Sequence, residues 1–321
     1  MRLFGAFLVL WNALYNAAAP EIVDPRPFWL RGFGTLRAKG YAANLKNPRS
    51  TLMKFHPVQI AFSAALVFSS AAFAQTPAPA AAEPAAAPLT FNISLASNYK
   101  FRGQDQDQSR TKAFKPALQG GVDYAFDSGF YLGNWNSTIN WTKYLPSGQN
   151  SGVEIDLYGG YKFKAGPLDM DVGALTYVYP GAGKANTTEI YLGAGYGPFS
   201  AKYSSTISKG YFGIGNDTLL GVGSGGGRGT GYLSLAVAQE VAPKITLKAS
   251  LGFTNLKNAA NNAGFPNYMD YSAGASYDFG DGLSLSGALV GANKKTNWVY
   301  AIDPTKSINK NTLVVMLTKA L

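Results

Sequence analysis

Apolar and polar side chains alternate with a period of two between residues 89 and 103. Successive side chains of a β-strand point to opposite faces, so this alternation predicts a strand with one apolar and one polar face. Its length is close to the ~9–11 residues of a tilted strand that crosses a membrane. The pattern returns in the segments 116–126, 130–141, 153–163, 168–178, 189–196, 199–208, 231–240, 244–255, 269–279, 283–292 and 311–321. The sequence therefore predicts twelve strands of one kind.

The connections between these strands alternate in length. Short ones rich in Gly or Pro lie at 128–129, 166–167, 197–198, 241–243 and 280–282. Long polar ones lie at 103–115, 142–152, 179–188, 209–230, 256–268 and 293–310. An even number of strands with tight turns at one end and long loops at the other is the layout of an outer-membrane barrel. We predict an all-β fold: an antiparallel transmembrane β-barrel of about 12 strands, with short periplasmic turns, six long extracellular loops and both termini in the periplasm.

A soluble two-layer sandwich is the alternative for twelve amphipathic strands. The polar faces carry Asn, Ser, Gly and paired charges, which are too polar for a dry core. The apolar faces carry aromatic residues close to strand ends, as an interfacial girdle of a membrane barrel requires. These aromatic residues are Tyr99, Phe101, Tyr124, Phe126, Tyr131, Trp141, Tyr196, Tyr277 and Phe279. The barrel is the interpretation that explains both faces.

Turn chemistry also predicts how strands pair. A two-residue loop at 166–167 pairs Lys164 with Asp169 and Lys162 with Asp171, and both pairs join opposite charges on the polar face.

A two-residue loop at 128–129 similarly pairs Val122 with Trp135 and Phe126 with Tyr131 on the apolar face. The apolar face of this strand then holds Tyr131, Trp135, Ile139 and Trp141, and the polar face holds Asn134, Asn136, Thr138 and Asn140.

The first quarter of the chain resembles a processed leader. Residues 53–74 read as a signal peptide, with a charged start, an apolar core over 60–68 and the small-residue cleavage site Ala72-Phe73-Ala74. Residues 1–52 then read as an upstream over-extension, although the apolar run 3–19 is an alternative signal or anchor. Residues 75–88 form a Pro/Ala-rich periplasmic leader, and 89–321 form the barrel.

Composition excludes several kinds of chemistry. The chain has no cysteine, and its single histidine, His56, lies in the predicted signal peptide. Disulfides, Cys or His metal sites and Ser-His or Cys-His nucleophile pairs are therefore excluded from residues 75–321. The net charge of +10 falls to about +4 once residues 1–74 are removed, which argues against a nucleic-acid partner. No cofactor and no metal are expected.

Three motifs near the start of the predicted barrel resemble a known family. They are the run Ser97-Asn98-Tyr99-Lys100-Phe101-Arg102-Gly103, the run 117–124 with Ala-Leu-Gln-Gly-Gly, and the run 128–135 with Gly-Phe-Tyr-Leu-Gly-Asn-Trp. These are similar to the proteobacterial porin-like family labelled TorF or Gcw_chp. The resemblance implies an outer-membrane channel of undefined substrate, with the first motif as its first strand. One departure is the end of the chain, where Leu321 replaces the aromatic residue expected as an assembly signal.

Charged side chains on the polar faces are the candidate pore-lining residues. Rings or ladders of such charges set the ion preference of a channel. Lys100 and Arg102 have no partner by turn register, so we predict that they form the constriction. The alternative role of the other charges is to neutralise one another across strands. The full set is Lys100, Arg102, Asp123, Glu154, Asp156, Lys162, Lys164, Asp169, Asp171, Glu189, Lys202, Lys244, Lys248, Asp270 and Asp278.

Other motifs point to less specific chemistry. The carboxylate pairs Glu154/Asp156 and Asp169/Asp171 share strand faces, but alternating acids are common on any polar face, so no enzyme is predicted. The run 221–229 superficially suggests a phosphate loop, yet it lacks the Gly-Lys-Ser/Thr ending and is interpreted as a flexible external loop. Residues 105–107 resemble part of a calcium loop and are interpreted as a solvated loop.

These patterns predict a porin-like channel for passive diffusion of small polar or ionic solutes in the outer membrane of a Gram-negative bacterium. Its expected partners are outer-membrane lipid, lipopolysaccharide, the barrel-assembly machinery and the solutes themselves. A non-conducting structural, adhesive or receptor barrel that displays its loops is the alternative function. A plug formed by residues 209–230, the longest loop, is also left open, as is the oligomeric state.

Overall fold

The computed structural model describes residues 88–146, 148–216 and 223–321, all of which belong to one compact unit. The predicted over-extension, the signal peptide and all of the Pro/Ala leader except Pro88 lie outside the described residues. Within the described ranges, no helix has both the length and the apolar character needed to cross a membrane.

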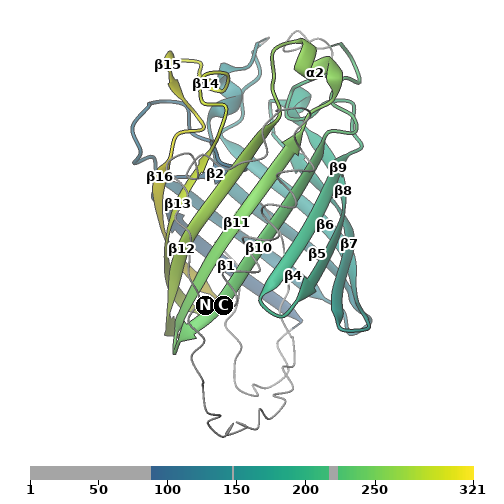
Figure 1. Ribbon diagram of the computed structural model, residues 1–321, viewed down its shortest axis with the longest axis vertical. Helices are drawn as coiled ribbons and strands as arrows, with labels where there is room; N and C mark the ends of the chain where they lie inside the picture. The colour runs from purple at the N-terminus through teal and green to yellow at the C-terminus, as the bar shows by residue number, and fades with distance from the viewer. Residues whose placement is uncertain (1–87, 147, 217–222) are drawn as a thin grey trace, which may run out of the picture. The chain divides into compact units, whose positions relative to one another are not determined.

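Twelve long strands close into an antiparallel barrel (Figure 1). Each strand pairs with its neighbours in the chain, and the first pairs with the last through Asn92 opposite Ala320. The strands are β1 (Leu89–Ala96), β4 (Ala117–Ala125), β5 (Phe130–Thr138), β6 (Val153–Ala165), β7 (Leu168–Val178), β8 (Thr187–Tyr196), β9 (Phe199–Thr206), β10 (Gly231–Ala242), β11 (Ile245–Asn255), β12 (Tyr268–Gly280), β13 (Leu283–Ala292) and β16 (Thr312–Ala320). The predicted fold class and strand number are confirmed.

The barrel has a turn end and a loop end. At the turn end the strands are joined by tight turns, such as Gly166-Pro167, where Gly166 has a φ of 59°. Leu321 also lies at this end, hydrogen-bonded to Phe91. The connections at the loop end are longer and contain the short elements β2 (Lys100–Phe101), β3 (Gln104–Asp105), η2 (Trp141–Tyr144), η3 (Gly183–Ala185), α2 (Asn258–Asn262), β14 (Val299–Tyr300) and β15 (Asp303–Ser307), of which α2, β14 and β15 stand above the wall in Figure 1.

The outer surface of the barrel is apolar. Alternate side chains of the strands point outward from the barrel. Among them, Leu95, Leu157 and Leu192 are each more than half exposed. Near the turn end, the ring pairs Tyr124–Phe126 and Tyr277–Phe279 have centroids 4.7 and 4.9 Å apart. A soluble protein does not expose an apolar surface around its whole circumference, so this surface is built for contact with lipid.

The pairing of β6 with β7 agrees with the turn-based prediction. Lys164 lies opposite Asp169, and Lys162 lies opposite Asp171. The Gly-Pro loop has two residues, as its sequence indicates, and the register follows from it.

The pairing of β4 with β5 differs from the prediction by one residue. The loop has three residues, because the Phe126 amide donates to the Phe130 carbonyl and Gly129 takes a φ of 95°. Val122 therefore lies opposite Asn134, and not opposite Trp135. A slip of one residue sends every side chain of a strand to the other face.

The face assigned to β5 is consequently wrong. Tyr131 and Trp135 point into the barrel, with 6% and 3% of their surface exposed. Phe130 and Leu132 point outward, each with 59% exposed. The interior therefore gains two large aromatic side chains that the sequence pattern had placed in lipid.

The predicted first strand is also too long. β1 ends at Ala96, and the chain then leaves the wall and turns inward. Tyr99 and Phe101, predicted for the outer girdle, are buried inside the barrel with 4% and 6% exposed. Residues 97–103 do alternate between apolar and polar side chains, but both sets of side chains contact protein and neither contacts lipid.

Candidate functional site: the barrel interior

A small hairpin enters the interior at the loop end. In this inner hairpin, residues 97–106, Lys100 lies opposite Asp105 and Phe101 lies opposite Gln104. The two residues between the strands, Arg102 and Gly103, both have positive φ, 46° and 77°. This is the geometry of a type I′ turn, which matches the twist of a tight hairpin.

The tip of the inner hairpin touches the barrel wall. A Cβ atom added to Gly103 would lie 2.7 Å from the carbonyl oxygen of Gly291, 2.8 Å from the Cβ of Asp270 and 2.9 Å from the Cβ of Ala292. Only glycine fits at these distances and at this φ. The hairpin therefore leaves β1 and ends against β12 and β13.

Arg102 connects the tip to a different part of the wall. Its Nη1 and Nη2 donate to the two carboxylate oxygens of Glu189 on β8, at 3.0 and 2.7 Å. Its guanidinium carbon lies 4.0 Å from the ring centroid of Tyr232 on β10. Burial acts to lower the pKa of Arg102, but the attraction of Glu189 raises it well above its ordinary value, so the group is charged. Turn register gave Arg102 no partner, and the partner that the structure shows, Glu189, lies on a strand that no turn joins to the hairpin.

Asp105 forms ion pairs with Lys100 of the inner hairpin and with Lys115, which follows the hairpin in the chain. Its carboxylate lies 3.2 Å from Lys100 Nζ and 2.8 Å from Lys115 Nζ, and it accepts hydrogen bonds from Asn98 Nδ2 at 3.0 Å and from Tyr300. Burial lowers the pKa of Lys100 to about 8, although Asp105 opposes the shift. Asp105 is 1% exposed, so the interpretation of residues 105–107 as a solvated loop is wrong for this residue.

Aromatic and acidic side chains of the wall and the loops pack against Tyr99 and Phe101 of the inner hairpin. Tyr99 and Tyr179 each donate a 2.6 Å hydrogen bond to Glu154. The ring of Phe101 contacts those of Tyr177 and Phe212, with centroids 5.5 and 5.1 Å away. Phe212 belongs to the connection between β9 and β10, whose possible role as a plug was left open. Two connections thus fill the loop end of the interior together.

A second set of such side chains lies nearer the turn end on the same side of the barrel. Tyr131 donates to Asp171 at 2.7 Å, and Tyr158 donates to Asp123 at 2.6 Å. Lys202 Nζ lies 3.8 Å from the ring centroid of Tyr191. The inward faces of β5 to β8 therefore carry large side chains, which interact with one another and with Asp123 on β4 and Lys202 on β9.

Most inward side chains of the remaining strands are small, with Tyr232, Asp270 and Met316 among the exceptions, and we call the small ones the small-residue wall. It runs over β10 to β13, β16 and β1. Ser250 and Ser272 on it share a 2.6 Å hydrogen bond, and Ser94 and Thr318 share one of 2.8 Å. Its members are Ser94, Ser234, Ala236, Ala238, Ser250, Ser272, Gly274, Ser286, Ala288 and Thr318. Large inward side chains are thus more frequent on β5 to β8 than on these strands.

Other candidate residues lie at the turn end or on the interior face. Lys244 is exposed in the turn between β10 and β11 and has a φ of 67°, so its predicted place on a strand is wrong. Lys164 and Asp169 form an ion pair in which the lysine side chain is 61% exposed. Asp278 is partly buried near the turn end of β12. Asp270 and Lys248 point inward, with 6% and 7% exposed.

The tyrosines of the interior were not predicted from the sequence. Tyr158, Tyr177 and Tyr191 are each at most 8% exposed. Tyr158 and Tyr191 lie two positions after a carboxylate, Asp156 and Glu189, and therefore share its face. That spacing was the available signal.

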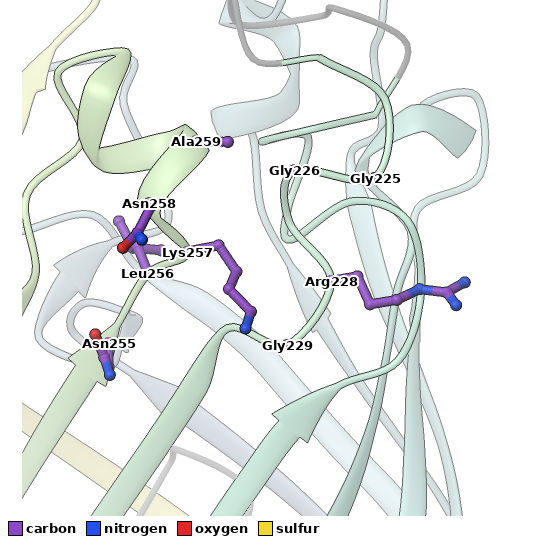
Figure 2. Close-up of a pocket in the computed structure, with 9 residues that line it drawn as sticks. All are labelled: Gly225, Gly226, Arg228, Gly229, Asn255, Leu256, Lys257, Asn258 and Ala259. Carbon is purple, nitrogen blue, oxygen red and sulfur yellow. The ribbon is translucent and has the colours of Figure 1, made fainter.

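The glycine-rich run near residue 225 does not form a phosphate loop. It borders a cavity of about 460 Å³ at the loop end, lined by Gly225, Gly226, Arg228, Gly229 and residues 255–259 (Figure 2). The amides of Gly225 and Gly227 donate to carbonyl oxygens of Gly215 and Lys209, so they are not available to a phosphate. Figure 2 shows the Lys257 side chain lying along Gly229, whose absent side chain leaves room for it.

Residues 80–321 of the chain match a model of a known protein family. The family is described as a bacterial protein of unknown function, Gcw_chp. The chain belongs to this family. The resemblance noted from the sequence is confirmed at this level, whereas the TorF label stays a prediction. No curated protein matches the chain.

Solved structures similar to the chain are membrane barrels. The NanC porin matches with 11% identity and a TM-score of 0.45, covering 72% of this chain and 98% of that chain. The KdgM porin matches with 8% identity and a TM-score of 0.42, covering 72% and 97%. Outer membrane phospholipase A from Escherichia coli matches with 12% identity and a TM-score of 0.38, covering 72% and 91%. At these identities the likeness concerns the fold alone.

Proposed function

We propose that the protein is an outer-membrane channel through which small polar or ionic solutes diffuse passively. The observation that carries the proposal is a closed barrel with an apolar outer surface and a charged, hydroxyl-rich interior. An apolar outer surface is stable when lipid surrounds it. Polar side chains on the inner surface can contact water and dissolved solutes. The tight turns and both ends of the mature chain then face the periplasm, and the longer connections face the exterior.

The inner hairpin makes this channel narrow. Twelve strands enclose less space than the ~16–18 strands of open porins. Arg102, Glu189 and Glu154 lie across the loop end of that space with at most 3% of their surface exposed. The proposed constriction is therefore a folded segment held in place by ion pairs, and solutes pass beside it.

Conductance tests the proposal. The protein purified in detergent and inserted into planar bilayers should give small, discrete current steps. Heat-modifiable mobility in gel electrophoresis shows independently that the barrel is folded. A folded barrel that gives no steps would contradict the channel.

A second function is favoured by one observation. The packed layer around Tyr177 and Tyr179, which are 2% and 1% exposed, is what a non-conducting barrel that displays its loops would have. The same conductance measurement separates the two functions. We propose no catalytic role, because both carboxylate oxygens of Glu154 accept tyrosine hydrogen bonds and Asp169 pairs with Lys164 at the turn end.

A further inference from the structure

Lys248 is a cation of the interior that the fold does not neutralise. It points inward from β11 and is 7% exposed. Its cross-strand neighbours are Ala238 on β10 and Gly274 on β12, neither of which has a polar side chain. Among the residues that the structure describes, the ion pairs within 4.0 Å all belong to other lysines or to Arg102.

The other interior cations have partners that Lys248 lacks. Arg102 pairs with Glu189, and Lys100 and Lys115 share Asp105. Lys162 lies opposite Asp171 and its Nζ is 4.7 Å from the ring centroid of Tyr131. An ammonium group with no carboxylate partner attracts anions, so a mobile anion that enters the interior is the natural counter-charge for Lys248.

The surroundings of Lys248 suit a small anion. It lies on the small-residue wall, where Ser250 is two positions along the same strand and Ser272 lies opposite Ser250. The two Oγ atoms are 2.6 Å apart. Serine hydroxyls donate hydrogen bonds to an anion as readily as to each other. The residues that face Lys248 from the neighbouring strands, Ala238 and Gly274, have at most one side-chain carbon each.

We propose that Lys248, with the hydroxyls of Ser250 and Ser272, forms a subsite for small anions such as halides and small carboxylates. The inference rests on the proposed channel function and names its substrate class. The solute path runs along the small-residue wall past Lys248, and the channel prefers anions to cations.

Reversal potentials in a potassium chloride gradient test the subsite. Replacing Lys248 by Gln should lower the ratio of chloride to potassium permeability about tenfold, because one unscreened charge at the path is lost. The Lys248→Arg variant keeps the charge and should retain the preference. The control is Lys244→Gln, which removes a charge from the exposed turn between β10 and β11 and should leave the ratio unchanged. An unchanged ratio in Lys248→Gln, or an equal fall in Lys244→Gln, would overturn the proposal.

A binding measurement separates the failure of the subsite from the failure of the channel. Exchange of chloride at a protein cation broadens the chloride NMR line of a detergent solution of the barrel. Lys248→Gln should reduce this broadening more than Lys244→Gln does. If folded protein conducts no current but shows this difference, the subsite stands and the channel does not. Equal broadening in wild type and both variants would exclude the subsite, and heat-modifiable mobility confirms folding of each variant.

Discussion

The ion pair between Arg102 and Glu189 should hold the inner hairpin inside the barrel. Both side chains are almost fully buried, at 3% and 2% exposed, and their contact is bidentate. Replacing Arg102 by Met leaves the Glu189 carboxylate buried without its counter-charge. Breaking a buried pair in this way costs about 3–5 kcal/mol of unfolding free energy, whereas replacing both members by apolar residues is often close to neutral. The double variant Arg102→Met/Glu189→Leu should therefore recover most of the loss.

Denaturant unfolding of the detergent-solubilised barrel, followed by tryptophan fluorescence, measures these differences. The matched control is Lys164→Ala, which breaks an ion pair whose lysine side chain is 61% exposed and should cost about 0–1 kcal/mol. The reasoning is refuted if Arg102→Met loses no more stability than Lys164→Ala. It is also refuted if the double variant is as unstable as the sum of the two single variants, because the two residues would then act independently.

Three further perturbations test other parts of the structure. Gly103→Val should displace the hairpin tip from the wall, because the added Cβ would lie 2.7 Å from the Gly291 oxygen. The displacement should raise single-channel conductance, and unchanged conductance would argue against the hairpin as the constriction. Leu192→Arg on the outer surface, where Leu192 is 52% exposed, should cost about 2–4 kcal/mol in lipid vesicles, and a neutral effect would argue against its burial in lipid. The pKa of Tyr179 is raised by burial and by Glu154, so unfolding free energy should be fully present below pH ~10 and fall above it. The Tyr179→Phe variant should show a shallower fall between pH ~10 and 11 in denaturant titrations, and an identical slope would contradict the shift.

The barrel could be predicted from the sequence because the information is local. Each strand carries its own period-two alternation, and each turn carries its own Gly or Pro. The pairing of Lys162 with Asp171 needed only the length of one turn, which the Gly166-Pro167 dipeptide specifies. Such features involve residues close in the chain and are visible without knowledge of the rest of the fold.

The interior was less predictable, because the inward face of a strand can carry aromatic residues just as the outward face does. Trp135 and Tyr131 are large aromatic residues, so a rule that sends aromatic residues to lipid places them outside. The three-residue loop ending at Gly129 reverses the assignment, and its sequence alone is compatible with either loop length. The alternation of Tyr99 and Phe101 likewise continues that of β1, although contacts with Glu154 and Phe212 hold these residues inside. Long-range contacts decide these cases.

The contacts of the inner hairpin also indicate that the proposed constriction is fixed in place and is not a gate. To leave the interior, the hairpin must separate Arg102 from Glu189 and release the packing of Phe101 against Tyr177 and Phe212. Loss of the ion pair alone costs about 3–5 kcal/mol, which leaves less than about 1% of molecules with the hairpin out. In the proposed channel, solutes therefore pass with the hairpin in place, beside the small-residue wall. Single-channel records should accordingly show one dominant conductance level, and frequent steps to a much larger level would show that the hairpin moves.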